Sequence, residues 1–252
     1  MNNISNSSRE MQIARKLKRA QLDPIRIEGN TIVSGLAGAL NYVHGTLLDL
    51  GCGDMPYANL MAERTTFHVG TDLRPRPDSP PTVCSDSLYL PFKAESFDTV
   101  LCTQVLEHVR DPFKLMHEVS RVLKLNGHAI FTMPATWPLH EEPYDYFRYT
   151  RYGLEELSRI NGLNIVKLEE RGGGIAAIAQ LTAALLYDVF GKNRLTRVTM
   201  KVALFPLLSM SLLLDRVFYY PKFTLGYLMV ARKGERMSPH ETHGHKNDPS
   251  NS

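Results

Sequence analysis

The stretch that decides the fold is LLDLGCGD, at residues 47–54. A short apolar run, typical of a strand buried on both faces, leads straight into two glycines, and a helical pattern follows. Glycines at such a turn let the backbone approach a ligand closely, and the next helix offers free N–H groups at its start. Pro56 stands where a dinucleotide fingerprint needs its third glycine, which argues against a pyrophosphate on that helix. The stretch therefore predicts an α/β domain that binds a different ligand after its first strand.

Short apolar runs and helical patterns alternate outward from this stretch. Strands are predicted at 46–50, 67–72, 97–103, 128–133, 164–169 and 224–231, and helices at 56–62, 111–123 and 154–160. Asp111 and Pro112 suit the N-cap and the first turn of the second helix. The alternation predicts a Rossmann-like α/β fold, in which a doubly wound and mostly parallel sheet carries helices on both faces.

Composition limits the classes of function. The chain has 252 residues, of which 43% are hydrophobic, enough for one sizeable core. Lys and Arg total 29 against 26 Asp and Glu, so no nucleic-acid partner is predicted. Three cysteines without metal-ligand spacing fit a reducing compartment. Because the first residues also lack the apolar core of a secretory signal, we expect the protein in the cytoplasm, with the inner face of the membrane as a second possibility.

Changes in composition predict five segments along the chain. They are an N-terminal basic helical extension at 1–30, the α/β core at 31–174, an apolar helical insertion at 175–222, a final sheet strand at 223–232, and a disordered tail at 233–252, which has too little apolar content to pack. The insertion is a poor membrane-spanning candidate, because Lys201 and Pro206 interrupt its second apolar run. Three alternatives stay open for it: packing on the sheet, a homodimer interface, or peripheral contact with a membrane through the basic residues beside it.

A carboxylate follows the second predicted strand. The segment VGTD ends at Asp72, about 20 residues beyond the glycine turn, where ribose hydroxyls bind in sheets of this kind. Two longer segments follow VGTD: DSLYLPFKAESFDTVLCTQVLEHV at 86–109 and DPFKLMHEVSRVLKLNGHAIFTMP at 111–134. With LLDLGCGD and VGTD they make four segments in this order. In these four segments the chain resembles the class I S-adenosylmethionine-dependent methyltransferases of the type 11 group.

This resemblance implies S-adenosylmethionine as the cofactor and assigns residues to its parts. It implies that the methionine part is cradled by Asp49, Gly51 and Gly53, that the ribose is held by Asp72, that the adenine faces Asp86 or Ser87, and that Gln104 lies beside the cofactor after the fourth strand. Because the sulfonium already carries an excellent leaving group, the protein must supply in-line positioning and a means of removing the acceptor's proton.

Candidates for the acceptor side lie in WPLHEEPYDYFRY at 137–149, after a strand's carboxyl end. We predict His140 as the general base with Glu141 beside it as a second catalytic residue. Aromatic rings and polar groups of this loop suit a sugar or planar acceptor. The predicted acceptor-binding residues are Trp137, Tyr144, Tyr146 and Arg148.

Candidate metal ligands follow the strand predicted at 97–103. Glu107 and His108, with the later His140, resemble part of the ligand set Glu-x-x-Glu-His and His of metal-assisted methyltransferases. The first position of that set is Gln104 here, and a neutral amide is a weaker ligand for a hard cation. We therefore predict no metal, and expect Glu107 and His108 to serve in helix capping and packing.

The segment HEEPYDYFRYT also resembles, more loosely, methyltransferases encoded with bacterial surface-polysaccharide and glycolipid machinery. This resemblance favours O-methylation of a saccharide or a lipid-linked cell-envelope precursor, with a small-molecule or lipid-linked acceptor as the partner. Two alternatives stay open. One is a quinone or polyprenyl-phenol methyltransferase, and the other is a cofactor-binding pseudoenzyme that acts as a scaffold.

Overall fold

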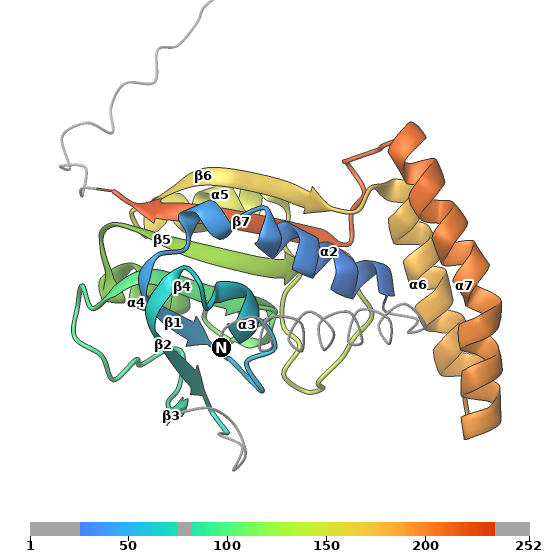
Figure 1. The fold of residues 1–252 in the computed structure, drawn as a ribbon, viewed down its shortest axis with the longest axis horizontal. Helices are drawn as coiled ribbons and strands as arrows, with labels where there is room; N and C mark the ends of the chain where they lie inside the picture. Colours follow the sequence, from blue (N-terminus) through green and yellow to red (C-terminus); the bar gives the residue numbers. More distant parts are fainter. Residues whose placement is uncertain (1–25, 75–81, 235–252) are drawn as a thin grey trace, which may run out of the picture.

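The computed structural model describes residues 26–74 and 82–234. Within these residues, seven strands form one sheet in the order β3-β2-β1-β4-β5-β7-β6 (Figure 1). The strands are β1 Gly45–Leu50, β2 Thr65–Asp72, β3 Thr82–Cys84, β4 Phe97–Thr103, β5 Leu123–Pro134, β6 Leu163–Arg171 and β7 Gly226–Lys233. β7 pairs antiparallel with β5 and β6, and the other pairings are parallel. The predicted fold class, a mostly parallel α/β sheet, is confirmed.

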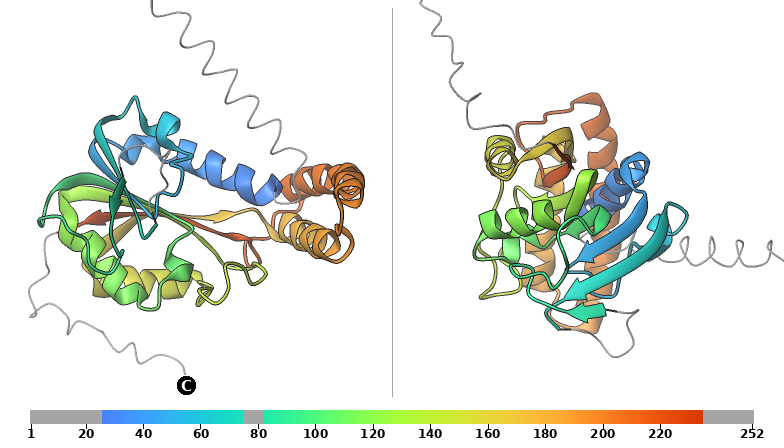
Figure 2. Two further views of the ribbon diagram at one scale, coloured as in Figure 1. Left: turned by 90° about the horizontal axis from the view of Figure 1, so that it is seen from below. Right: turned by 90° about the vertical axis from the view of Figure 1, so that its left-hand side faces the viewer.

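Helices cover both faces of this sheet, as Figure 2 shows from two sides. The helical elements are α2 Arg26–Ala37, η1 Leu40–Tyr42, α3 Ala58–Met61, η2 Leu106–His108, α4 Pro112–Val122, α5 Arg151–Ile160, α6 Gly174–Phe190 and α7 Arg194–Val217. α4 and α5 pack on one face, and α2 and α3 pack on the other. The N-terminus of α4 forms as the sequence predicts, because the side chain of Asp111 accepts a hydrogen bond from the Lys114 amide and Pro112 occupies the first turn.

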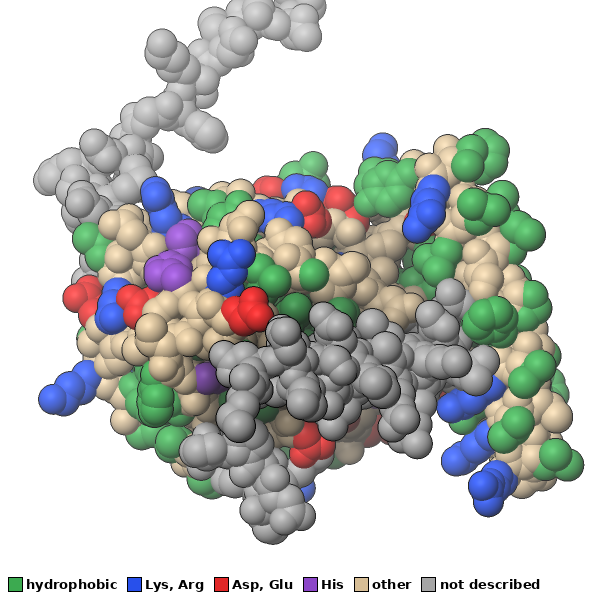
Figure 3. All heavy atoms as spheres, viewed as in Figure 1, with side chains coloured by type: hydrophobic (Ala, Val, Ile, Leu, Met, Phe, Trp, Pro, Cys, Tyr) green, Lys and Arg blue, Asp and Glu red, His purple; other side chains and the backbone are tan. Residues whose placement is uncertain are grey.

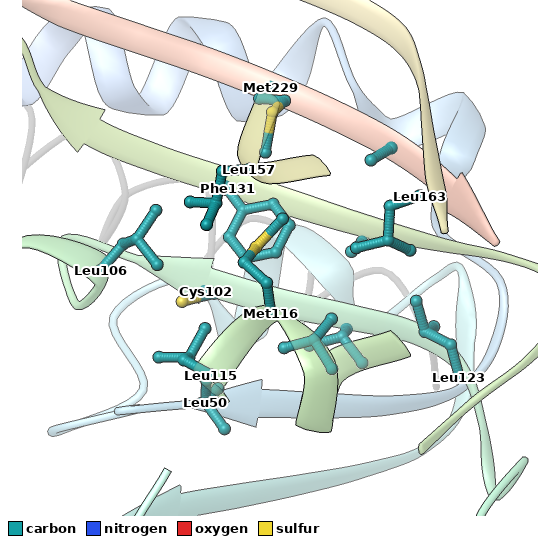
Figure 4. Packing of buried hydrophobic residues seen from close by; sticks show 14 of the residues in the cluster. Leu50, Cys102, Leu106, Leu115, Met116, Leu123, Phe131, Leu157, Leu163 and Met229 are labelled. Atoms are coloured by element: carbon teal, nitrogen blue, oxygen red, sulfur yellow. The ribbon is translucent and has the colours of Figure 1, made fainter. Parts of the chain in front are cut away.

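Alternate residues of β1 contribute to two hydrophobic clusters, one on each face of the sheet. Leu48 and Leu50 belong to the cluster under α4 and α5, whereas Leu47 belongs to the cluster under α2. Figure 4 shows Leu50 in the first cluster with Met116 of α4 and other buried side chains of the neighbouring strands and helices. The central strands therefore bury side chains on both faces, which places their carboxyl ends in fixed register at one edge of the sheet.

Several sequence-based boundaries need correction. The helix predicted at 56–62 shortens to α3, because turns follow it before β2 begins at Thr65. The strand β3 and the helix α2 were not predicted. α2 crosses the boundary at residue 30 between the extension and the core, and its Ile32 and Leu36 are buried against the sheet. Residues 1–25 of the predicted extension and 235–252 of the predicted disordered tail lie outside the described residues.

The helical insertion before the last strand is present, and it forms a hairpin of α6 and α7 that projects from one end of the sheet (Figure 1). Small side chains of α6 pack against larger ones of α7, so that Ala176, Ala179 and Ala183 share a cluster with Leu204 and Leu208. β6 runs parallel to β5, because both pair antiparallel with β7. The hairpin therefore leaves the sheet at the edge where the parallel strands end.

Candidate active site

The predicted cofactor residues meet at this edge. β1, β2, β4 and β5 are mutually parallel, so the glycine turn at 51–53, Asp72, Gln104 and the loop at 135–150 all follow carboxyl ends of neighbouring strands. Ligands of open α/β sheets bind in the crevice outside these ends.

The glycine turn leaves open space beside the backbone. Gly51 and Gly53 both have positive φ, 65° and 50°, a conformation that side chains rarely allow. A side chain at Gly51 would also collide with Val105, whereas nothing lies within 4 Å of the Cβ position at Gly53. The Gly53 amide donates to Asp72 Oδ2 at 3.0 Å, which ties the turn to the end of β2. A ligand can therefore approach the backbone at Gly53.

Asp49 supplies a buried negative group below the turn. Its side chain is almost fully buried, and neither carboxylate oxygen has a hydrogen-bond partner among the described residues. His68 Nε2 lies 3.5 Å from Oδ2, a contact with poor hydrogen-bond geometry. Burial raises the pKa of Asp49, and His68 opposes this shift. An unpartnered carboxyl group at this place fits the ammonium group of the methionine part of S-adenosylmethionine.

The other cofactor residues lie further along the edge. Asp72 accepts from the Gly53 and Arg74 amides, and its carboxylate keeps lone pairs for two ribose hydroxyls. The side chain of Gln104 donates to Thr132 Oγ1 at 3.2 Å, which holds the amide against β5. Asp86 is exposed and caps a turn through the Leu88 amide, beside the half-buried Ser87.

Ser85 is a candidate that the sequence analysis missed. Its hydroxyl is buried without a partner among the described residues, and its amide donates to the Asp72 carbonyl. An unsatisfied hydroxyl so close to the ribose-binding position suits the adenosine part of the cofactor. The signal in the sequence was weak, because Ser85 is one of several polar residues in this segment.

The acceptor loop, residues 135–150, is stabilised by a partly buried ion pair that the sequence did not reveal. Arg148 donates to both carboxylate oxygens of Asp145 at 2.6 Å, and also to the carbonyls of Trp137, Pro138 and Phe147. These bonds hold the pKa of Asp145 well below its usual range. Arg148 was predicted to bind the acceptor, but its donors are engaged within the loop, so the structure supports a positioning role.

His140 is oriented by Asp145. The His140 amide donates to Asp145 Oδ2 at 3.0 Å, and His140 Nδ1 lies 3.2 Å from the same oxygen. With Nδ1 facing a carboxylate, Nε2 is the ring nitrogen left to accept a proton. Glu141, the predicted second catalytic residue, is exposed in a turn whose carbonyl accepts from the Tyr144 amide. The carboxylate that contacts His140 is therefore Asp145 and not Glu141.

The expectation that Glu107 caps a helix is wrong, although its side chain is buried. No side chain caps η2, whose N-cap is Val105, and both carboxylate oxygens of Glu107 are buried without a hydrogen-bond partner among the described residues. Burial raises the pKa of Glu107 from 4.5 to about 8. The backbone carbonyl of Glu107 accepts from the Tyr146 amide, so the acceptor loop docks directly over it.

Glu107, His108 and His140 come together, although they belong to two segments. One ligand atom from each lies within 4.8 Å of the others, and the two imidazole rings meet edge-on with centroids 4.7 Å apart. Nδ1 of His108 lies 2.9 Å from the Tyr144 carbonyl, so both histidines engage Nδ1 and leave Nε2 as the free nitrogen. These three residues can hold a divalent cation of the transition series. The amide of Gln104, bonded to Thr132, is not one of the three.

The predicted aromatic acceptor residues divide into two groups. Trp137 packs partly against the cluster of the α6–α7 hairpin, and the Tyr146 hydroxyl accepts from Arg110 Nε at 2.9 Å. Tyr144, by contrast, exposes 51% of its surface close to the two histidines. Among the four predicted acceptor-binding residues, Tyr144 thus offers the ring best placed for stacking on an acceptor.

We expect Glu107 to make the stability of the protein depend on pH. Because its pKa in the folded state is about 8 and its ordinary value is 4.5, the folded state retains a proton that the unfolded state loses between these values. Stability should therefore fall by up to about 1.4 kcal/mol per pH unit across this window. In Glu107→Gln the loss is absent, so we expect its Tm to exceed that of the wild type by several degrees at pH 9 and to match it near pH 4.5.

Thermal unfolding in the presence of EDTA measures this difference without interference from a bound cation. Glu63→Gln is the control, because Glu63 is exposed and far from the cluster along the chain. A Tm difference between wild type and Glu107→Gln that is the same at both pH values would contradict the buried, protonated state of Glu107.

Comparison with known protein families gives a match over residues 48–131, to the family model described as a methyltransferase domain, Methyltransf_11. Among curated proteins, a ubiquinone biosynthesis O-methyltransferase of Alkalilimnicola ehrlichii is 31% identical over 127 residues, which are 45% of this chain and 49% of that protein. The corresponding enzyme of Aliivibrio fischeri is 25% identical over 44% of this chain and 51% of its own length. The chain spans about half the length of these relatives.

Solved structures share the fold. Phosphoethanolamine N-methyltransferase 2 of Haemonchus contortus, in complex with S-adenosyl-L-methionine, aligns with a TM-score of 0.54 at 18% identity, over 80% of this chain and 52% of that one. An S-adenosylmethionine-dependent methyltransferase of Mesorhizobium loti aligns with a TM-score of 0.51 at 19% identity, over 77% and 96% of the two chains. At these identities the likeness concerns the fold.

Proposed function

We propose that this chain, which carries a class I S-adenosylmethionine-dependent methyltransferase domain over residues 48–131, methylates an oxygen of a saccharide or a lipid-linked cell-envelope precursor. The recognition of this family and of its cofactor from the sequence is confirmed. The observation that carries the proposed chemistry is the pair of His140 and Asp145. It lies in the loop after β5, at the same edge of the sheet as the predicted cofactor residues, which we call the cofactor edge.

The residues divide the work between binding and proton removal. Bound S-adenosylmethionine supplies an electrophilic methyl group whose bond to sulfur breaks as the acceptor oxygen attacks, with the electron pair going to the sulfur. Asp49 and the glycine turn hold one end of the cofactor, and Asp72 holds its ribose. With no cation bound to His140, its Nε2 takes the proton of the acceptor hydroxyl, and Asp145 holds the ring in place and stabilises the imidazolium.

A quinone or polyprenyl-phenol acceptor remains the second candidate. The curated relatives named as ubiquinone biosynthesis O-methyltransferases favour it, and a phenolic hydroxyl loses its proton more easily than a sugar hydroxyl. The exposed ring of Tyr144 suits either a sugar face or an aromatic ring. Both candidates allow a lipid-linked hydroxyl, and an acceptor of this kind favours an enzyme that works from the cytoplasm at the inner face of the membrane.

Methyl-labelled S-adenosylmethionine discriminates between these acceptors. The protein is incubated with a bacterial lipid extract that is then separated into glycolipid and quinone fractions. We expect label in the glycolipid fraction for the wild type and a strong loss for His140→Ala. Label in the quinone fraction would replace the proposed acceptor with the second candidate. A protein that binds the cofactor but labels neither lipid fraction, and no water-soluble saccharide of the same cells, would support the scaffold alternative.

A further inference from the structure

The α6–α7 hairpin presents an unusual amount of apolar surface. By length and composition, α7 is apolar enough to cross a membrane. Its most apolar stretch of 18 residues has a mean hydropathy of 1.6, and only 22% of this stretch is buried. Figure 3 shows hydrophobic side chains along the hairpin. Large apolar side chains that expose more than half of their surface include Leu185, Leu195, Val198, Val202, Met210 and Leu213. A surface of this kind calls for an apolar partner.

α7 is fixed to the sheet domain and cannot leave it as an independent spanning helix without breaking buried bonds. Asp215, near its end, is buried and accepts hydrogen bonds from the Gly173 and Ala176 amides at 2.8 and 3.3 Å. At its other end, Arg194, Arg197 and Lys201 occupy the first two turns. These anchors favour a hairpin that lies on a membrane surface over one that crosses the bilayer.

A basic pocket lies at the free end of the hairpin. It has a volume of about 360 Å³, and its lining includes Lys192, Arg194, Arg197 and Lys201 without any acidic side chain. Arg197 is held in place by the Gly191 carbonyl, and Lys201 lies over the ring of Tyr187. Figure 3 shows Lys and Arg side chains gathered at this end. Four cations around one cavity suit the phosphate of a lipid headgroup.

The position of the hairpin links this surface to the active site. Arg171, at the end of β6, and Pro134, at the end of β5, both pair with Gly226, so the hairpin and the acceptor loop leave the sheet side by side. Trp137 of the acceptor loop packs against the cluster inside the hairpin. A membrane that contacts the hairpin therefore lies near the loop that carries His140.

We propose that the α6–α7 hairpin docks on an anionic bilayer, with phospholipid headgroups bound in the basic pocket and the exposed apolar side chains inserted between acyl chains. This inference rests on the proposed function, because it takes the acceptor to be lipid-linked. It adds that the enzyme reaches this acceptor at the membrane surface on which the hairpin docks. The docking itself needs neither cofactor nor turnover, so it can be tested separately.

Co-sedimentation with vesicles tests the docking. We expect the wild type to bind vesicles that contain phosphatidylglycerol more strongly than pure phosphatidylcholine, and to bind less at high salt. Each basic side chain near an anionic surface contributes a factor of roughly five, so Arg194→Gln, Arg197→Gln and Lys201→Gln together should weaken binding about a hundredfold. Val202→Asp with Met210→Asp should reduce the apolar contribution and weaken binding to both kinds of vesicle.

A matched control removes the same charge elsewhere. Arg64, Lys93 and Arg232 are exposed outside the hairpin, and their replacement by Gln should change vesicle binding less than twofold. No binding by the wild type, equal loss in both triple variants, or a stable dimer that ignores vesicles would overturn the docking. Calorimetry with S-adenosylmethionine on the same variants separates this outcome from failure of the proposed function, because the hairpin variants should keep the cofactor affinity of the wild type.

Discussion

Replacing His140 with alanine is expected to lower turnover by about a hundredfold or more, with the affinity for S-adenosylmethionine nearly unchanged. The reason is the geometry of the loop after β5, where Asp145 faces Nδ1 of His140 and leaves Nε2 to accept the acceptor's proton. Turnover is measured with methyl-labelled S-adenosylmethionine and the lipid fraction that takes up most label. Added imidazole should restore part of the lost turnover.

His117→Ala is the matched control, because His117 is exposed on α4. Asp145→Asn should also loosen the loop, because Asp145 pairs with Arg148 as well as with His140. The Tm of this variant is therefore measured beside its turnover, so that a loss of loop structure is distinguished from a loss of catalysis. Full activity in His140→Ala would contradict the assignment of His140 as the base and would return it to the class of surface histidines.

Asp72→Ala is expected to weaken the binding of S-adenosylmethionine by a hundredfold or more. Two hydrogen bonds from ribose hydroxyls to a carboxylate contribute about 1.5 to 3 kcal/mol each, and 1.4 kcal/mol corresponds to a tenfold change in affinity. The alanine also releases the Gly53 amide, which Asp72 holds at 3.0 Å, and so loosens the glycine turn. Calorimetric titration of the variant measures the loss.

Asp72→Asn separates the two contributions, because its amide oxygen can still accept from Gly53 while the charge is gone. We expect it to lie between the wild type and Asp72→Ala. Glu63→Ala, in the connection before β2, should bind as the wild type does. An Asp72→Ala protein that binds the cofactor within threefold of the wild type would show that the ribose lies elsewhere.

The cofactor edge was predictable because it depends on strands whose ends are set by local sequence. Gly51, Gly53 and Asp72 directly follow apolar runs, and parallel pairing then brings them together. The start of α4 was predictable for a similar reason, since Asp111 and Pro112 act on the backbone next to them.

Features that depend on tertiary contacts were not predictable. The order of charges in HEEPYD gave no reason to prefer Asp145 over the adjacent Glu141, because the loop turns back on itself before it meets His140. Helix α2 was missed since Gly29 and Gly35 disfavour a helix by propensity. A Cβ at Gly35 would lie 3.0 Å from the Leu228 side chain, so the glycine lets α2 approach β7 closely. Packing here outweighs propensity.

Glu107 illustrates the same limit at the active site. A single acidic residue after a strand suggests a helix cap, and its burial arises from a loop almost 40 residues further along the chain, whose Tyr146 amide binds the Glu107 carbonyl. The proximity of His108 and His140 likewise follows from the docking of this loop. The sequence shows that acidic residues and histidines follow these strands, but it does not show that Glu107, His108 and His140 come together.

Calorimetric titration of the wild-type chain with S-adenosylmethionine tests the central claim most directly. The account predicts binding of one cofactor per chain at micromolar strength, because Asp49, the glycine turn and Asp72 stand ready at the ends of β1 and β2. A parallel titration with a nicotinamide dinucleotide should give no binding, since Pro56 replaces the third glycine that a pyrophosphate needs. Absence of binding to S-adenosylmethionine, or binding of the dinucleotide in its place, would contradict the account.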